Sequence, residues 1–189
     1  IATTTRMIEI EPENVQVLLL RARLEYMIEQ YAEVVADCRQ VIELDKGQLM
    51  AYLLQGRAKK RLGDLLGAVV VLSQAIQLKE DFAEALLLRA EIMLEMKNAK
   101  DGLEDVEKVV QLLPEEEQGY LVRGQLLEVL EQNTEAEADY RYIIELNPFN
   151  EQAYLRLGSL YLKSKQVEQA IALFDEAIEL KPDFAQAYH

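Results

Sequence analysis

The sequence predicts an all-α protein, a right-handed solenoid built from antiparallel helix pairs. Three observations predict this fold. The sequence repeats itself every 34 residues, each repeat holds two stretches with the apolar spacing of a helix, and all four prolines fall at the same place in the repeat. Similar short segments begin, 34 residues apart, at Leu18, Tyr52, Leu86, Tyr120 and Tyr154.

The repeat period also predicts the domain organisation. We number the positions of one repeat as slots 1 to 34 and expect residues 1–189 to form one array. The complete repeats are 15–48, 49–82, 83–116, 117–150 and 151–184. Residues 1–14 match the end of a repeat and residues 185–189 match the start of another. We therefore expect the sequence to be a piece of a longer array.

Each repeat is predicted to contain a first and a second helix. By apolar spacing, the first helices are 15–28, 49–61, 83–96, 117–130 and 151–163. The second helices are 31–44, 65–78, 99–112, 134–146 and 167–180. Short polar turns such as Gly63-Asp64 join the two helices, and links this short make neighbouring helices antiparallel.

Two slots mark the ends and the contacts of these helices. Slot 32 holds Pro12, Pro114, Pro148 and Pro182, and proline suits the start of a helix but cannot continue one. Slot 8 holds only alanine or glycine: Ala22, Gly56, Ala90, Gly124 and Gly158. Because glycine costs a helix about 1 kcal/mol relative to alanine, its recurrence predicts a close contact between the paired helices.

Slots 7 and 23 vary together. Arginine at slot 7 occurs wherever slot 23 holds aspartate, and an antiparallel hairpin brings these slots level with each other. We predict three ion pairs within repeats: Arg21–Asp37, Arg89–Asp105 and Arg123–Asp139. Glu25 and Lys59 share slot 11, which suggests a further pair across adjacent repeats.

Composition excludes several function classes. The net charge of −14 disfavours binding to nucleic-acid backbones or anionic lipid and mildly favours basic partners. Half of the residues are hydrophobic, but no apolar run is long enough to span a bilayer. No signal peptide is recognisable, so the compartment is left open, with the cytoplasm as the default.

The residues that carry most enzyme chemistry are scarce. His189 is the single histidine and Cys38 the single cysteine, so we expect no metal site, no cofactor and no nucleophilic catalytic pair. Cys38 occupies the slot of Leu72, Tyr140 and Phe174, which predicts a buried core thiol. We expect a protein that is not an enzyme.

The pattern resembles the tetratricopeptide repeat family over essentially the whole chain. The last repeat carries the family signature at Tyr154, Leu157, Gly158, Tyr161, Ala170, Phe174, Ala177 and Pro182. The first repeat departs from it, with Val34, Cys38 and Val41 in place of the usual small, aromatic and alanine residues.

The resemblance implies a concave groove lined by the first helices, where a peptide or partner segment would bind. The residues that would line it here are Leu19, Arg23, Leu53, Leu54, Arg57, Lys60, Arg61, Leu87, Leu88, Glu91, Glu95, Leu121, Gln125, Glu128, Leu155 and Ser159. Slot 5 is leucine in every repeat. These leucines either pack against the adjacent repeat as core or form an apolar row that takes a hydrophobic segment.

The resemblance predicts a protein interaction scaffold whose partner is a protein or peptide. One alternative is a co-chaperone-like binder of apolar client segments, and another is a regulatory or tethering segment of a larger protein. Some family members bind the acidic tails of Hsp70 and Hsp90 through lysine and asparagine at slots 5 and 9. Those residues are absent at both slots here, so we do not expect recognition of that tail.

Overall fold

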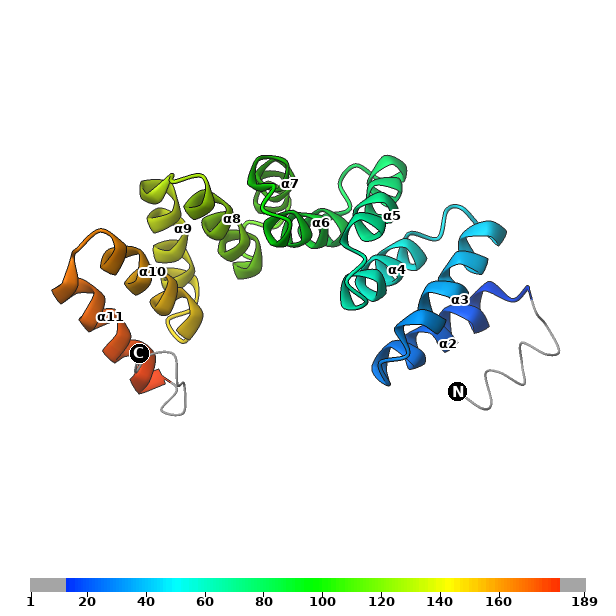
Figure 1. Ribbon diagram of the computed structural model, residues 1–189, viewed down its shortest axis with the longest axis horizontal. Coiled ribbons are helices and arrows are strands. Elements are labelled where there is room, and N and C mark those ends of the chain that lie inside the picture. Colours follow the sequence, from blue (N-terminus) through cyan, green and yellow to red (C-terminus); the bar gives the residue numbers. More distant parts are fainter. Residues whose placement is uncertain (1–12, 181–189) are drawn as a thin grey trace. The chain divides into compact units, whose positions relative to one another are not determined.

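The computed structural model describes residues 13–180, and this part of the chain forms ten α-helices (Figure 1). They are α2 Val15–Met27, α3 Tyr31–Leu44, α4 Leu49–Arg61, α5 Leu65–Leu78, α6 Ala83–Glu95, α7 Ala99–Leu112, α8 Glu117–Val129, α9 Asn133–Leu146, α10 Glu151–Lys163 and α11 Val167–Leu180. Each bound agrees with the predicted one to within one residue. The predicted all-α solenoid of helix pairs is confirmed.

The chain divides into two compact units, Ile1–Met96 and Lys97–His189. The first unit contains α2 to α6 and the second contains α7 to α11. Within each unit every helix packs against the next one in the sequence, and in the first unit α2 also contacts α4 and α4 contacts α6. The division falls inside the predicted repeat 83–116, so one continuous array stays a prediction.

The turn inside each repeat uses one backbone conformation. The residue at slot 15 has a positive φ in all five repeats: Glu29 63°, Gly63 78°, Lys97 59°, Glu131 61° and Lys165 61°. In the fourth repeat the N–H of Gln132 donates to the carbonyl of Leu127 at 2.9 Å, and that of Glu131 donates to Glu128 at 3.1 Å. This hydrogen-bond pattern is the Schellman motif, which ends a helix and reverses the chain.

Short polar side chains start three of the helices. The side-chain oxygen of Asn14 accepts from the N–H of Val17, that of Asp64 from Gly67, and that of Asn150 from Ala153. Each bond satisfies one of the N–H groups that the first turn of a helix leaves without a partner.

The predicted close contact at slot 8 is with slot 24 of the second helix. A Cβ added to Gly124 would lie 2.5 Å from Cε1 of Tyr140, and one on Gly158 would lie 2.6 Å from Cε1 of Phe174. Glycine is therefore required where slot 24 is large. The first repeat has alanine at slot 8 and the small Cys38 at slot 24, and both are fully buried.

Candidate partner-binding site

The first helices of the second unit form a hollow on the predicted groove face. Its volume is about 460 Å³, and α8 and α10 line it with residues from slots 2, 5, 6 and 9. These residues are Gln118, Leu121, Gln125, Gln152, Leu155, Arg156 and Ser159. The structure thus brings together four of the predicted groove residues, Leu121, Gln125, Leu155 and Ser159.

A second hollow of about 480 Å³ continues the first one over the turns between repeats. The two share Gln118, Leu121 and Gln152. Acidic and amide side chains surround the second hollow, and the exposed ring of Phe149 stands at it. Sequence reasoning missed this extension because half of its residues, among them Phe149, lie in the turns before α8 and α10, outside the helix slots used to define the groove.

The leucine row at slot 5 belongs to the core. The exposed fractions of Leu19, Leu53, Leu121 and Leu155 are 6%, 2%, 6% and 9%. In the same row Leu87 is half-buried, and at slot 6 Leu88 is buried, Leu54 is half-buried and Leu20 is exposed.

Packing against the next repeat explains the burial of the leucine row. Leu19 lies in one cluster with Ala51, and Leu121 lies in one cluster with Ala153, which are the slot 3 alanines of the following repeats. Of the two alternatives, core packing therefore describes the four buried leucines. Around Leu121 and Leu155, amide, hydroxyl and arginine side chains line the hollow.

Several predicted groove charges pair with one another across adjacent repeats. Nζ of Lys60 lies 3.0 Å from Oε2 of Glu91 and 2.9 Å from Oε1 of Glu95. Nζ of Lys163 lies 2.5 Å from Oε2 of Glu128, whose side chain is 8% exposed. Lys60, Glu91, Glu95 and Glu128, all predicted to line the groove, therefore have counter-charges within the chain.

The remaining predicted basic residues lie on the surface. Arg23, Arg57 and Arg61 are exposed. Arg61 reaches back to the preceding repeat, where its guanidinium lies 3.7 Å from Glu29 and stacks over the ring of Tyr31 at 5.2 Å. In the second unit Arg156 is exposed within the groove hollow.

The structure places two of the three predicted arginine–aspartate pairs in contact. Arg21 donates from Nε and Nη2 to the two carboxylate oxygens of Asp37 at 2.6 and 2.5 Å. Arg123 does the same with Asp139 at 2.9 and 2.5 Å. These hydrogen bonds raise the pKa of both arginines.

In the second and third repeats, the residue at slot 7 has a different hydrogen-bond partner. Gln55 is buried and donates to the carbonyl of Val35 in the preceding repeat at 3.1 Å. Arg89 donates to Ser73 at 2.7 Å. Because Arg89 and Asp105 belong to different units, their pairing stays a prediction.

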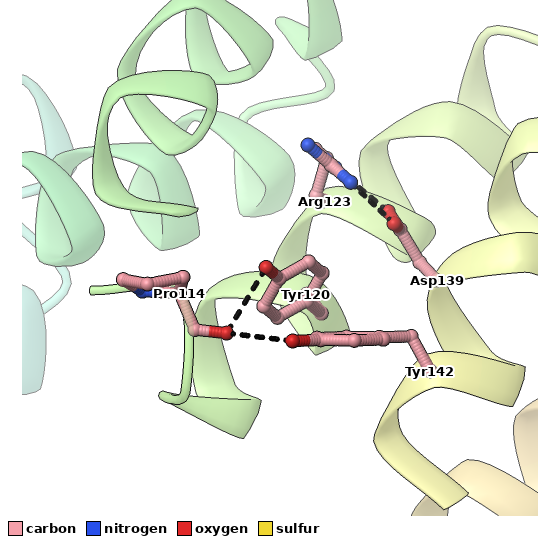
Figure 2. A network of polar contacts seen from close by, with 5 residues as sticks. All are labelled: Pro114, Tyr120, Arg123, Asp139 and Tyr142. Atoms are coloured by element: carbon pink, nitrogen blue, oxygen red, sulfur yellow. Dashed lines mark hydrogen bonds and ion pairs between the residues drawn. The ribbon is translucent and has the colours of Figure 1, made fainter. Parts of the chain in front are cut away.

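A tyrosine network holds the start of α8 against α9. Figure 2 shows the hydroxyls of Tyr120 and Tyr142 converging on the carbonyl of Pro114, each at 3.1 Å. The two rings lie 4.5 Å apart, and the guanidinium of Arg123 lies 5.2 Å from the ring of Tyr120 while it binds Asp139. The network fixes the helix that supplies half of the groove hollow.

The suggested pair between Glu25 and Lys59 does not form. Lys59 binds Asp64 at 2.5 Å, a partner five residues away on the adjacent turn. Glu25 is 6% exposed, lies 3.6 Å from Arg21, and its Oε2 atom has no hydrogen-bond partner. Burial, followed by the nearby charge of Asp37, raises the pKa of Glu25 to about 7.

Residues 13–180 contain no cluster of three or more histidine, cysteine, aspartate or glutamate side chains placed to hold a metal ion. Cys38 is fully buried, and burial raises the pKa of its thiol to about 12. Among the described helices none is long and apolar enough to cross a membrane. His189, Pro12 and Pro182 lie outside the described residues.

Comparison with known proteins gives one family and one fold. Residues 121–183 match the family model of the tetratricopeptide repeat. None of the curated proteins matches the chain.

Solved structures share the fold at low sequence identity. YrrB, described as a TPR protein with an unusual peptide-binding site, has a TM-score of 0.80 at 20% identity, covering 98% of this chain and 96% of its own. MamA from Desulfovibrio magneticus RS-1 has a TM-score of 0.84 at 19% identity, covering 90% and 96%. Yeast Tom70 has a TM-score of 0.74 at 19% identity, and the match covers 98% of this chain but 40% of Tom70.

Proposed function

Because the chain is a tetratricopeptide repeat protein, we propose that it is a non-enzymatic scaffold that holds a peptide segment of a partner protein in the groove across α8 and α10. The observation that carries the proposal is the hollow of about 460 Å³ lined from slots 2, 5, 6 and 9 of these two helices. The description of YrrB as having a peptide-binding site supports this use of the fold.

The side chains around the hollow suit an extended peptide. Three glutamines and Ser159 offer both donors and acceptors, which match the N–H and C=O groups that an extended backbone presents along its length. Arg156 is exposed at the same place and would pair with a carboxylate of the partner. The buried leucines give the groove a firm floor.

The burial of the leucine row removes the main support for a binder of apolar client segments. A leucine that is 2% to 9% exposed offers little surface to a client. The part of Tom70 that remains outside the match is compatible with the other alternative, a tethering segment of a larger protein. Under either alternative, we would still propose the groove as the place where a partner binds.

A peptide-display selection against the 189-residue chain tests the proposal. Enriched peptides would be measured by fluorescence anisotropy with the unmodified chain, with Ser159→Arg in the groove and with Ala172→Arg on the exposed side of α11. We expect Ser159→Arg to weaken binding about tenfold or more, because it fills the hollow, while Ala172→Arg has no effect. A selection that enriches no peptide, or peptides that bind Ser159→Arg normally, would contradict the proposal.

A further inference from the structure

Residues of α7, α8 and α9 line a third hollow, which lies within the second unit. Its volume is about 380 Å³, and its walls include the apolar side chains of Leu103, Leu127 and Ala138. Glu107 of α7 and Glu135 of α9 also line it, and both of these side chains are exposed. Its α8 residues occupy slots 7 and 11, about 120–180° around the helix from the α8 residues of the groove. The hollow is therefore a second surface, independent of peptide binding in the groove.

Negative charge is in excess around this hollow. Arg123 and Asp139 also line it, but they bind each other through two hydrogen bonds and their charges cancel. Glu107 and Glu135 form no ion pair in the part of the chain that the structure describes, residues 13–180. Two carboxylates beside apolar walls favour a positively charged group on an apolar stem.

Between the first and second repeats, the chain places a cation of its own at the corresponding slots. Lys59 occupies there the slot of Leu127, and Asp64 occupies the slot of Gln132, another residue of the hollow. Nζ of Lys59 lies 2.5 Å from Oδ2 of Asp64, and the lysine side chain is 18% exposed. A cation is thus held, largely covered, at the place where the hollow lies between the third and fourth repeats.

Between the fourth and fifth repeats, an arginine has the same position. Arg141 occupies the slot of Glu107, and Tyr161 occupies the slot of Leu127. Nη2 of Arg141 donates to the hydroxyl of Tyr161 and lies 2.8 Å from Oε1 of Glu137. The hydroxyl of Tyr161 in turn donates to the same carboxylate at 2.7 Å. A guanidinium is therefore bound at these slots by a carboxylate and a polar neighbour.

Between the third and fourth repeats, the chain has no counterpart of these two cations. The slots of Lys59 and Arg141 hold Leu127 and Glu107, and Arg123 already binds Asp139. The repeat that lacks the internal cation is the one with a hollow and two carboxylates without an ion pair. This correspondence indicates that the cation comes from another molecule.

We propose that this hollow binds an arginine side chain from a basic segment of a partner protein. The apolar stem packs on the leucine and alanine walls, and the guanidinium donates to the carboxylates of Glu107 and Glu135. Arginine suits the place better than lysine, because its planar group carries five N–H donors and can bind two carboxylates at once. Residues 97–189 hold nineteen acidic and nine basic residues, so the field of this unit attracts a basic segment and repels an acidic one.

An NMR titration of the isotope-labelled chain tests the proposal. The probe is the peptide acetyl-Gly-Ser-Arg-Ser-Gly-amide, and its control contains citrulline, which has nearly the same shape as arginine but no charge. We expect the arginine peptide to shift the methyl signals of Leu103, Leu127 and Ala138 to saturation. It should bind about fivefold or more tightly than the citrulline peptide, and added sodium chloride should weaken it.

Two pairs of substitutions separate the hollow from the general acidity of the chain. Glu107→Gln combined with Glu135→Gln should weaken the arginine peptide about tenfold, because both carboxylates are lost. The matched control combines Glu104→Gln with Glu145→Gln, which remove the same charge from exposed positions of α7 and α9 outside the hollow, and should weaken it less than about twofold. Circular dichroism would establish that both double variants keep their helices.

A third substitution fills the hollow from within the chain. Glu107→Arg places an arginine at the slot that Arg141 occupies in the fourth repeat, and it should abolish binding of the arginine peptide. The groove variant Ser159→Arg should leave this binding unchanged, so failure of the groove proposal would be a separate result. Three results overturn the inference: no saturable shift at the hollow, equal affinity for the citrulline peptide, or an equal loss of affinity in the two double variants.

Discussion

Asp139 shows how much a single buried carboxylate depends on its partner. Its side chain is 5% exposed and accepts two hydrogen bonds from Arg123, whose side chain is 26% exposed. We expect Asp139→Ala to lower the free energy of unfolding by about 2–4 kcal/mol, because it leaves a half-buried guanidinium without its counter-charge. Replacing Arg123 and Asp139 together with leucine should cost less, and urea denaturation measures both changes.

The exposed pair between Lys79 and Asp81 supplies the control for Asp139. Its atoms lie 4.0 Å apart, with side chains 51% and 66% exposed, so Asp81→Ala should cost less than about 0.5 kcal/mol. Two results would contradict this prediction: a loss of stability in Asp139→Ala no larger than that in Asp81→Ala, or a double leucine variant as unstable as Asp139→Ala. Either would show that the unpaired charge of Arg123 does not destabilise the fold.

Glu25 predicts a pH-dependent stability. Its pKa rises from an ordinary value of 4.5 to about 7 in the folded chain, so the folded state holds the proton more tightly than the unfolded state does. The stability contributed by this proton is complete below about pH 4.5 and is lost as the pH rises through 7. Glu25→Gln should therefore be more stable than the unmodified chain at pH 8, by about 1–3 kcal/mol, and equal to it near pH 4.5.

Thermal or urea unfolding at several pH values measures the effect of Glu25→Gln. Among the described residues, the charged groups that act on Glu25 are Asp37, Arg21 and Glu33, so the comparison keeps all three unchanged. The exposed Glu43 on the same helix as Asp37 is the control, and Glu43→Gln should show no such pH-dependent gain. A constant difference between Glu25→Gln and the unmodified chain at all pH values would show that ionisation is not the cause.

The sequence could predict two arginine–aspartate ion pairs, but it could not predict that Glu25 and Lys59 do not pair. Arginine and aspartate vary together across repeats, and this covariation indicated the Arg21–Asp37 and Arg123–Asp139 contacts. Glu25 and Lys59 offered a single pair of opposite charges. The outcome there depended on distances in space that the sequence does not give: Nζ of Lys59 lies 2.5 Å from Oδ2 of Asp64.

At the scale of the element, the helix ends were predictable because the repeat marks them, whereas the exposed face of a first helix was not. At about 100° per residue, slot 5 lies between slots 2 and 9 along the helix surface, about 60° around it from one and 40° from the other. Leu121 therefore lies between Gln118 and Gln125 at the base of the hollow, where it is buried in one cluster with Ala153 of the next repeat. A leucine in every repeat therefore indicated packing between repeats.

The turn at slot 15 gives a prediction for the helix ends. Glu131 adopts a φ of 61°, a conformation that glycine reaches without the steric cost that other residues carry. Glu131→Gly should raise the free energy of unfolding by about 0.5–1 kcal/mol, as measured by thermal or urea unfolding. The helix interior is untouched, since Glu131 follows the end of α8.

A control substitution at Gln132, the next residue, distinguishes an effect of the left-handed backbone from a general effect of glycine on stability. Gln132 has a φ of −87°, so Gln132→Gly should not stabilise the chain and should lower its stability slightly. In the second repeat Gly63 has room for a side chain but a φ of 78°, so Gly63→Ala should destabilise. Stabilisation by Gln132→Gly equal to that of Glu131→Gly would refute a role for the left-handed backbone.

The choice between glycine and alanine at slot 8 depends on the size of the residue at slot 24. Gly124 faces Tyr140 and Gly158 faces Phe174, whereas the alanine of the first repeat faces Cys38. The size of slot 24 and the size of slot 8 vary in opposite directions. The recurrence of small residues predicted a contact, and comparing the two slots would have identified the partner.

For the whole molecule, the 34-residue period predicted an all-α solenoid, because stacked repeats bury the apolar side chains that a single repeat would leave exposed. The division after Met96 had no counterpart in the sequence, since the third repeat carries the same apolar spacing as the others. In such a fold the stability is approximately a sum of terms for each repeat and for each contact between neighbours.

This additive behaviour predicts a graded response to local damage. In Asp139→Ala, hydrogen exchange measured by mass spectrometry should lose most protection in α8 and α9, less in α7 and α10, and least in α2 and α3. The Asp81→Ala variant should leave the pattern unchanged. An equal loss of protection in all ten described helices would indicate one cooperative unit and contradict the prediction.

The ion pairs between Lys60, Glu91 and Glu95, and between Glu128 and Lys163, make neighbouring repeats chemically distinct from one another. A lysine at slot 12 faces glutamates in one junction, and a glutamate at slot 12 faces a lysine in the other. If the repeats were rearranged, Lys60 could be followed by Gln125 and Val129 at the same slots and would lose both counter-charges. The linear order of the repeats is therefore encoded in the junctions themselves, although the helices share one architecture.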